Sequence, residues 1–352
     1  MLACETDLKD LLRTLVDTES VSGSETHLAD MVEQALSSYS HLETIRFGNV
    51  VVARTNLGRA ERVVVAGHLD TVPVAGNLPS RTTKVHGCEA IVGRGACDMK
   101  GGVAVQLNLA STLTDPQRDL TWIFYDNEEV EASKNGLGHL AAHRPDLVHA
   151  DMAILMEPSD GRIEAGCQGS LRVRITTQGI AAHSARSWMG HNAIHDMAGA
   201  LQILNDYQAL EVNVDGLVYR EGLNAVAISG GIAGNVIPDR CELTVNYRFA
   251  PDKDLDQAEQ VVREIFSGYD MEILDASPAA RPGLTSPVVA SFVTAIGEVG
   301  PKYGWTDVAR FTQLGIPAVN YGPGDPNLAH TDEELVVLDS VKQTRDRLRS
   351  WL

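Results

Sequence analysis

The chain has 352 residues, of which 44% are hydrophobic and 22% are charged, as is typical of a globular protein with more than one domain. Its formal net charge of −18 argues against binding to a nucleic-acid backbone, which requires a basic face, and we attribute the charge to a solvated surface. No apolar run approaches the ~20 residues of a membrane helix, and the first residues lack the pattern of a signal peptide. The five cysteines contain no Cys-x-x-Cys, which favours a reduced cytoplasmic protein, with Cys97 as a buried packing residue.

The first half of the chain alternates predicted helices and strands. A helix is expected over residues 7–38, because the apolar residues near its start share one face. Buried strands are expected at 50–54, 62–67, 120–125 and 152–156, with helices at 99–113 and 137–143. This alternation predicts a mostly parallel sheet covered by helices on both faces.

The pattern changes near Gly169 and returns at Pro282-Gly283. Half-exposed strands are expected at 171–175, 225–230, 241–249 and 271–274, with helices at 192–204 and 254–266. After the return we expect a helix at 288–297, a strand at 318–321 and a closing helix from residue 333. The predicted fold is therefore an α/β domain split into residues 1–168 and 282–352, with an α+β domain, 169–281, inserted between the two parts.

Five residues with metal-binding side chains follow predicted strands or lie in the adjoining loops. They are His68, Asp98, Glu129, Glu157 and His330. Each one alone is weak evidence, because most such residues are solvated or serve another purpose. Their joint occurrence at the carboxyl ends of strands, where functional groups collect in open α/β sheets, is improbable by chance. Two imidazoles and three carboxylates predict a site for divalent cations.

Residues next to these ligands suggest further roles. Asp70 stands two residues after His68, so both side chains point to the same side, and Asp70 can accept the second imidazole N–H. Asp98 lies in a glycine-rich turn and can present its carboxylate to two metals. Glu128 and Glu129 point in opposite directions on an extended chain, so that one can bind metal while the other acts as an acid or base. A surface acidic pair is the alternative, which the preceding apolar strand disfavours.

The two remaining ligand candidates stand beside residues that restrict the backbone. Glu157 precedes Pro158, which holds it extended. His330 is predicted to precede a helix that Thr331 or Asp332 caps.

These motifs together resemble the di-zinc aminoacylase and carboxypeptidase family. The resembling segments are 67–71, 93–102, 126–129, 156–158 and 329–331, within a similarity that extends over residues 7–352. The resemblance implies two Zn²⁺ ions per subunit, for which Co²⁺ can substitute. It implies that His68 and Glu157 bind one ion, that Glu129 and His330 bind the other, and that Asp98 bridges them.

The same resemblance implies Glu128 as the general base and Asp70 as a catalytic residue that supports His68. It also implies that the parts 1–168 and 282–352 form the catalytic domain. The inserted domain, 169–281, would be a lid through which a homodimer forms.

Further segments resemble succinyl-diaminopimelate desuccinylases of the actinobacterial type, namely 125–132, 165–171, 181–186, 234–239, 246–249 and 306–311. This implies hydrolysis of N-succinyl-LL-2,6-diaminopimelate to succinate and LL-2,6-diaminopimelate, a step of lysine and diaminopimelate biosynthesis. The implied substrate-binding residues are Ser170, His183, Asn235, Arg248 and Thr306, of which His183 and Asn235 would reach into the partner subunit's site.

Several alternatives remain open at this point. Cys167-Gln168 stands where many desuccinylases carry an arginine pair, which leaves details of substrate binding open. His183 could be a turn residue without substrate contact, and Arg248 an exposed strand residue. An acetylornithine deacetylase or a dipeptidase of the same family is the nearest rival function. A non-catalytic binding descendant is disfavoured because every implied metal ligand and Glu128 are present.

Overall fold

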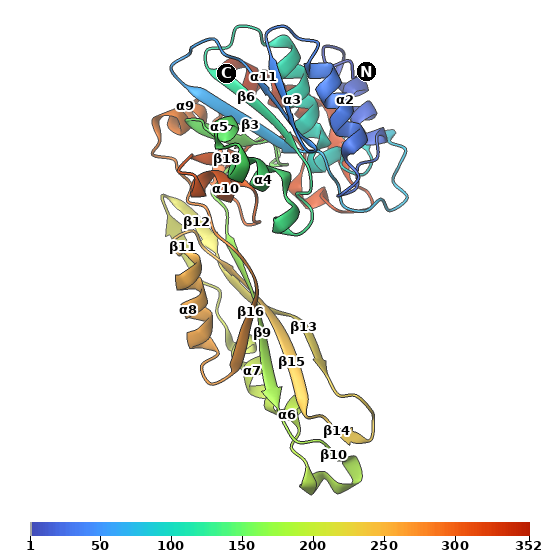
Figure 1. Ribbon diagram of the computed structural model, residues 1–352, viewed down its shortest axis with the longest axis vertical. Helices are drawn as coiled ribbons and strands as arrows, with labels where there is room; N and C mark the ends of the chain where they lie inside the picture. The colour runs from blue at the N-terminus through green and yellow to red at the C-terminus, as the bar shows by residue number, and fades with distance from the viewer. Residues whose placement is uncertain (1) are drawn as a thin grey trace. The chain divides into compact units, whose positions relative to one another are not determined.

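The computed structural model describes residues 2–352 and divides the chain into two compact units (Figure 1). Unit 1 comprises the chain up to Ala165 together with Gly283–Gly300 and Arg310–Leu352, and unit 2 comprises Gly166–Pro282 and Pro301–Ala309. The segment Pro301–Ala309 was predicted to belong with the first domain, but it groups with unit 2. Within that unit, the Trp305 indole N–H donates to the Pro278 carbonyl at 3.0 Å.

Unit 1 is built on an eight-stranded mixed sheet in the order β1-β2-β6-β3-β7-β18-β8-β17. The central strands β6, β3, β7 and β18 run parallel, whereas β1, β2 and β8 pair antiparallel with their neighbours. Every residue of β6 and β7 is buried, as expected for strands covered on both faces. The predicted α/β class is confirmed. The strands are β1 (Glu43–Phe47), β2 (Val50–Arg54), β3 (Arg62–His68), β6 (Asp119–Tyr125), β7 (Met152–Leu155), β8 (Ile163–Ala165), β17 (Val299–Pro301) and β18 (Ala318–Asn320).

The helices of unit 1 pack on this sheet and on one another. Helix α3 (Gly101–Thr112) is buried along nearly its whole length and contacts β3, α1 (Leu8–Asp17) and α11 (Leu338–Trp351). The other helices are α2 (Thr26–Leu36), α4 (Gly136–His143), α5 (Pro145–Val148) and α9 (Pro287–Ile296), while α10 (Val308–Gln313) begins in unit 2.

Two helix predictions for unit 1 were wrong in extent. The single helix expected over 7–38 is two helices, because the chain turns between them at Gly23, whose φ is +88°. The closing helix begins at Leu338 rather than Glu333, because β19 (Leu335–Val337) pairs first with β5 (Cys88–Val92) in a three-stranded sheet completed by β4 (Arg81–Val85). Neither Thr331 nor Asp332 therefore caps that helix, whose N-cap is Val337.

Unit 2 contains a four-stranded antiparallel sheet in the order β13-β15-β9-β16. Along β15 (Arg240–Phe249), alternate residues from Cys241 to Phe249 are buried and pack under the helices in one apolar core. The predicted helix at 192–204 is divided in two at Met197. The remaining elements are β9 (Gly169–Gln178), β13 (Gly222–Gly230), β16 (Asp270–Ser277), the pair β10 (Ala182–His183) and β14 (Val236–Ile237), the hairpin β11 (Glu211–Val214) and β12 (Leu217–Arg220), and helices α6 (Ala193–Asp196), α7 (Ala198–Asp206) and α8 (Leu255–Ile265).

Across residues 2–352, no helix combines the length and the apolar character required to cross a bilayer. All five cysteines are free thiols, and Cys97 is completely buried, as predicted.

Candidate active site

The metal-ligand candidates of unit 1 come from the carboxyl ends of its parallel strands and from two loops beside them. His68 is the last residue of β3, Glu129 follows β6, and Glu157 follows β7. Asp98 lies in the short irregular helix Ala96–Lys100 that leads into α3. His330, with a φ of +64°, lies in the loop between β18 and β19.

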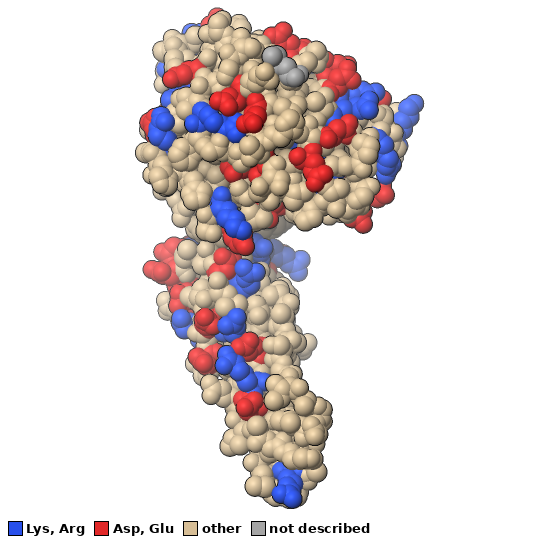
Figure 2. Space-filling model, turned by 45° about the vertical axis from the view of Figure 1, so that its right-hand side comes forward, with Lys and Arg blue, Asp and Glu red and all other residues tan. Residues whose placement is uncertain are grey.

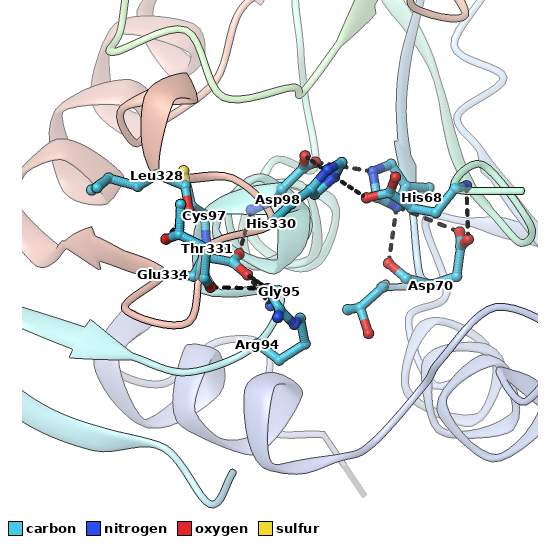
Figure 3. Close-up of polar contacts among 12 residues, drawn as sticks. His68, Asp70, Arg94, Gly95, Cys97, Asp98, Leu328, His330, Thr331 and Glu334 are labelled. Atoms are coloured by element: carbon cyan, nitrogen blue, oxygen red, sulfur yellow. Dashed lines mark hydrogen bonds and ion pairs between the residues drawn. The ribbon is translucent and has the colours of Figure 1, made fainter. Parts of the chain in front are cut away.

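The Asp98 carboxylate contacts the imidazoles of both His68 and His330 (Figure 3). Its Oδ1 atom is 3.2 Å from Nε2 of His68, and its Oδ2 atom is 3.3 Å from Nε2 of His330. The same His330 nitrogen is 2.8 Å from a carboxylate oxygen of Glu129. One ligand atom from each of His68, Asp98 and Glu129 lies within 4.8 Å of the others. The two oxygens of Asp98 thus face different imidazoles, which suits a carboxylate shared by two ions.

Glu157, the fifth candidate, lies close enough to His68 for its charge to act on that imidazole. Its side chain is buried, with 6% of its surface exposed, and its charge contributes to raising the pKa of His68. The candidate donors are two imidazoles and three carboxylates, a combination of side chains that fits zinc and other borderline divalent cations.

The Asp70 carboxylate is completely buried and holds two parts of the site together. Its oxygens accept the backbone N–H groups of Glu128 and Glu129, each at 3.0 Å, and the Ser22 hydroxyl at 2.7 Å. Nδ1 of His68 is 3.0 Å from the Asp70 carbonyl oxygen and 3.4 Å from its carboxylate. These contacts fix the orientation of the imidazole and leave Nε2 directed at Asp98.

In the metal-free protein the site is a network of ion pairs. Hydrogen bonds to Asp98 and Glu129 raise the pKa of His330 to about 10, although partial burial opposes the shift. Burial disfavours the charged form of His68, but hydrogen bonds to Asp70 and Asp98 outweigh it, and its pKa lies well above the usual range. Burial likewise opposes ionisation of Asp98, yet the two imidazoles lower its pKa. A divalent cation that binds here takes the place of these protons.

Three residues at this site were missed from the sequence. Ser22 contacts Asp70, and the buried pair Arg94 and Glu334 lies next to Asp98. Arg94 stands inside the glycine-rich turn, which was a usable signal. The burial of Glu334 could not be predicted from the sequence. Its neighbour Glu333 is the same type of residue and is exposed.

The substrate-binding candidates all lie in unit 2, where they form two groups. Ser170 and Arg248 are register partners on β9 and β15, and both are wholly or partly buried. The buried Thr306 is tied to the same end of the sheet, because its carbonyl accepts a contact from the Cys167 thiol at 3.9 Å. Arg248 is thus not the fully exposed strand residue of the alternative interpretation, and burial lowers its pKa.

The second group lies at the other end of the same strands, beyond β9 and β15 (Figure 1). His183 belongs to β10 and is the register partner of Val236 in β14. Asn235 precedes β14, and its carbonyl accepts the Ser184 N–H at 2.9 Å. Both His183 and Asn235 are exposed.

Comparison with known proteins agrees with this architecture. Residues 64–352 match the model of the peptidase family M20/M25/M40. A Mycobacterium tuberculosis protein described as a succinyl-diaminopimelate desuccinylase is 52% identical, with 100% of this chain and 99% of the relative covered. The succinyl-diaminopimelate desuccinylase of Corynebacterium glutamicum is 44% identical, over 97% of this chain and 95% of the relative.

Among solved structures, an aminopeptidase of Bacillus cereus superposes with a TM-score of 0.78 over 98% of this chain and 97% of the other, at 19% sequence identity. A tripeptidase of Staphylococcus aureus superposes with a TM-score of 0.79 over 99% and 97%, at 18% identity. These two likenesses concern the fold alone. The family model and the two full-length relatives show that the chain belongs to the M20/M25/M40 peptidase family.

Proposed function

We propose that the protein is a zinc-dependent amidohydrolase that cleaves N-succinyl-LL-2,6-diaminopimelate to succinate and LL-2,6-diaminopimelate. The observation that carries the metal chemistry is the Asp98 carboxylate, whose two oxygens lie 3.2 and 3.3 Å from the Nε2 atoms of two different histidines. The substrate assignment is supported by the full-length similarity to the Mycobacterium and Corynebacterium relatives. The free thiols of the five cysteines support a cytoplasmic location.

In this proposal two Zn²⁺ ions, or Co²⁺ in their place, are held by the five ligands. His68 and Glu157 would hold one ion, Glu129 and His330 would hold the other, and Asp98 would contribute to both. When bound, the ions polarise the amide carbonyl and lower the pKa of a water molecule to near neutrality.

Glu128 is the proposed general base. Its backbone N–H is held by Asp70 at 3.0 Å, which places the glutamate at the edge of the site while the neighbouring Glu129 turns to His330. Glu128 takes a proton from the attacking water and then gives it to the leaving amine. Asp70 acts through the residues it orients, because its oxygens bind both this segment and His68.

The residues of unit 2 account for substrate recognition in this proposal. Diaminopimelate carries two carboxylates and the succinyl group adds a third, and the guanidinium of Arg248 suits bidentate pairing with one of them. Ser170, whose hydroxyl accepts a hydrogen bond from Asn246 at 3.0 Å, and Thr306 lie at the same end of the sheet. We assign these three residues to the carboxylate-binding part of the site.

A homodimer is supported by the open edge of the antiparallel sheet. β13 is one of the two outer strands, and two of its apolar side chains are exposed, with 57% for Val226 and 54% for Ile228. Beyond its end, Ile232 is 85% exposed, and Trp188 near β10 is 79% exposed. Figure 2 shows a largely uncharged surface over the lowest part of unit 2 in that view. An open apolar strand edge of this kind invites pairing with a second copy around a two-fold axis.

The distance along the sheet explains why His183 would act in the partner subunit. From Ser170 to Gln178, β9 extends over roughly 26 Å at about 3.3 Å per residue, and β10 lies beyond that end. Arg248 and His183 of one chain are therefore far apart within unit 2. A site that uses both residues takes His183 and Asn235 from the partner, where the imidazole stabilises the oxyanion of the tetrahedral intermediate.

A subunit-mixing experiment tests this part of the proposal. His183→Ala and Glu128→Ala chains should each be inactive, and their heterodimer should regain activity because it contains one intact site. If heterodimers form but no activity returns, action across the interface is refuted.

Steady-state kinetics on N-succinyl-LL-2,6-diaminopimelate, N-acetylornithine and a dipeptide, with zinc saturating, test the substrate assignment. Donors that pair the succinyl carboxylate are left unmatched by an acetyl group, at about 1–3 kcal/mol each. We therefore expect kcat/KM for the succinyl substrate to be at least ~10²-fold higher. Equal values, or a higher kcat/KM for the acetyl compound, would favour a deacetylase function instead. A higher kcat/KM for a dipeptide would favour a dipeptidase function. Absence of hydrolysis of all three would favour a non-catalytic descendant.

A further inference from the structure

Arg94 and Glu334 form a buried ion pair next to the candidate metal ligand Asp98, and the pair has no part in the proposed reaction. The Nη1 atom of Arg94 is 3.0 Å from Oε2 of Glu334, and the two side chains are 4% and 1% exposed. Both residues stand next to predicted ligands: Arg94 in the turn that carries Asp98, and Glu334 in the segment that carries His330. Figure 3 shows the pair beneath these two ligands.

The Glu334 carboxylate is wrapped by the backbone of the Asp98 turn. Its Oε1 atom accepts the N–H groups of Cys97 and Asp98, each at 3.0 Å. Its Oε2 atom accepts the Gly95 N–H at 3.0 Å in addition to the Arg94 guanidinium. These four hydrogen bonds match the capacity of an ionised carboxylate. Three amides that converge on one anion leave the turn little freedom to move, and one of them belongs to the ligand Asp98 itself.

The Arg94 guanidinium connects the same turn to two other segments. Its Nε donates to the Pro73 carbonyl at 3.0 Å, in the loop that follows His68 and Asp70. Its Nη1 also donates to the Thr331 carbonyl at 3.1 Å, next to His330. Arg94 and Glu334 therefore join the three chain segments that carry His68, Asp98 and His330.

Burial of this pair is not explained by stability alone. Removing two charges from water costs free energy that their attraction only partly offsets, and apolar residues of similar volume often replace such pairs without loss. Apolar side chains, however, could neither accept the three amides nor donate to the two carbonyls. The contacts that only charged residues can make here are the ones that hold metal-ligand segments in place.

We propose that Glu334 and Arg94 are positioning residues for the metal centre. Glu334 fixes the direction of the Asp98 carboxylate, and Arg94 fixes the spacing of the Asp98 turn from His330. Together they set the affinity for the ion that Glu129 and His330 hold. This inference rests on the proposed dinuclear site, and neither residue touches metal or substrate.

The test measures metal affinity in Glu334→Gln and in a matched control. Glu221 in unit 2 is also a buried carboxylate, 3% exposed, which accepts the Ala250 N–H at 2.9 Å and pairs with Lys253 at 2.7 Å. Glu221→Gln therefore removes a comparable buried charge far from the ligands in sequence. Zinc affinity is measured by competition with a chelator, and the Co²⁺-loaded proteins are compared by visible absorption.

We expect Glu334→Gln to lower the affinity for one of the two ions by about 10- to 100-fold, the usual effect of removing a group that orients metal ligands. It should also change the Co²⁺ spectrum and lower kcat with little change in KM. Glu221→Gln should unfold at a lower temperature but bind both ions with the affinity of the wild type. Unchanged metal affinity in Glu334→Gln, or an equal loss in Glu221→Gln, would overturn the inference.

Arg94→Lys provides a second variant if Glu334→Gln does not fold. It keeps the positive charge beside Glu334 but cannot reproduce the planar contacts to Pro73 and Thr331. We expect weaker binding of the same ion, and wild-type affinity in this variant would also overturn the inference. The wild-type protein separates this result from the proposed function: if it binds fewer than two ions, the dinuclear site itself is refuted.

Discussion

Gly102 offers a perturbation whose effect can be worked out from the structure. It lies in the first turn of α3, and a Cβ atom added there would stand 2.3 Å from the Met156 carbonyl oxygen and 2.8 Å from the Met156 Cβ. Real Cβ contacts essentially never fall under 3.0 Å, so in Gly102→Ala the helix and the end of β7 have to separate. Backbone atoms, unlike the end of a flexible side chain, cannot rotate away. The displaced residue, Met156, directly precedes the predicted ligand Glu157.

The expected magnitude combines two opposing effects. Overpacking of this kind lowers the free energy of unfolding by about 1–3 kcal/mol. The higher helix propensity of alanine raises it by up to ~1 kcal/mol. After the full gain of ~1 kcal/mol is subtracted, the net loss is about 0–2 kcal/mol, which corresponds to a Tm lower by up to roughly 8 °C. Gly138→Ala in α4 is the control, because the added Cβ there meets only the guanidinium of Arg310, at 2.8 Å.

Thermal unfolding of the metal-free variants, followed by far-ultraviolet circular dichroism, measures this difference. Gly138→Ala should unfold at or above the wild-type temperature, since both variants gain the same helix propensity and only Gly102→Ala carries the backbone clash. Zinc should also bind more weakly to Gly102→Ala. If Gly102→Ala is as stable as Gly138→Ala, the reasoning from the contact distance is refuted.

Three further predictions concern the base, a buried carboxylate and the dimer. Glu128→Gln should retain both zinc ions and lower kcat by at least ~10²-fold, and near-normal turnover would reject the assigned role. Burial opposes ionisation of Asp119, but hydrogen bonds from the amides of Leu57 and Arg59 outweigh burial and lower its pKa. The ionised Asp119 therefore stabilises the folded protein above the ordinary aspartate pKa of about 4, and this stabilisation is lost as the pH falls below that value. Urea unfolding should therefore show a wild-type advantage over Asp119→Asn at neutral pH that shrinks in acid, whereas a constant difference down to pH ~2 would contradict this account. Ile228→Lys should shift the protein towards monomer in light scattering, and an intact dimer would exclude the β13 edge as the interface.

The sequence predicted the parts of the fold that rest on local pattern. The apolar runs at β3, β6 and β7 were predicted because strands buried on both faces have no polar alternation. The hairpin of β4 and β5 and the short β19 were missed, because they are held by pairing with distant segments rather than by their own composition.

In the candidate site, too, features set by local sequence could be predicted, and features set by distant contacts could not. The place of the candidate ligands in the fold could be predicted, because His68, Glu129 and Glu157 each stand at or just after the end of a recognisable strand. The direction of the Asp98 oxygens could not, because it depends on a turn that the distant Glu334 holds through three backbone amides. Burial of one member of the Glu333-Glu334 pair is a property of the folded chain and has no counterpart in the local sequence.

The measurement that tests the central claim most directly is the zinc stoichiometry of the protein reconstituted with zinc in excess. An Asp98 carboxylate whose two oxygens face two different imidazoles predicts two ions per chain, with hydrolysis of N-succinyl-LL-2,6-diaminopimelate lost to a chelator and restored by zinc or cobalt. One ion or fewer per chain, or activity that survives complete removal of metal, would contradict the account.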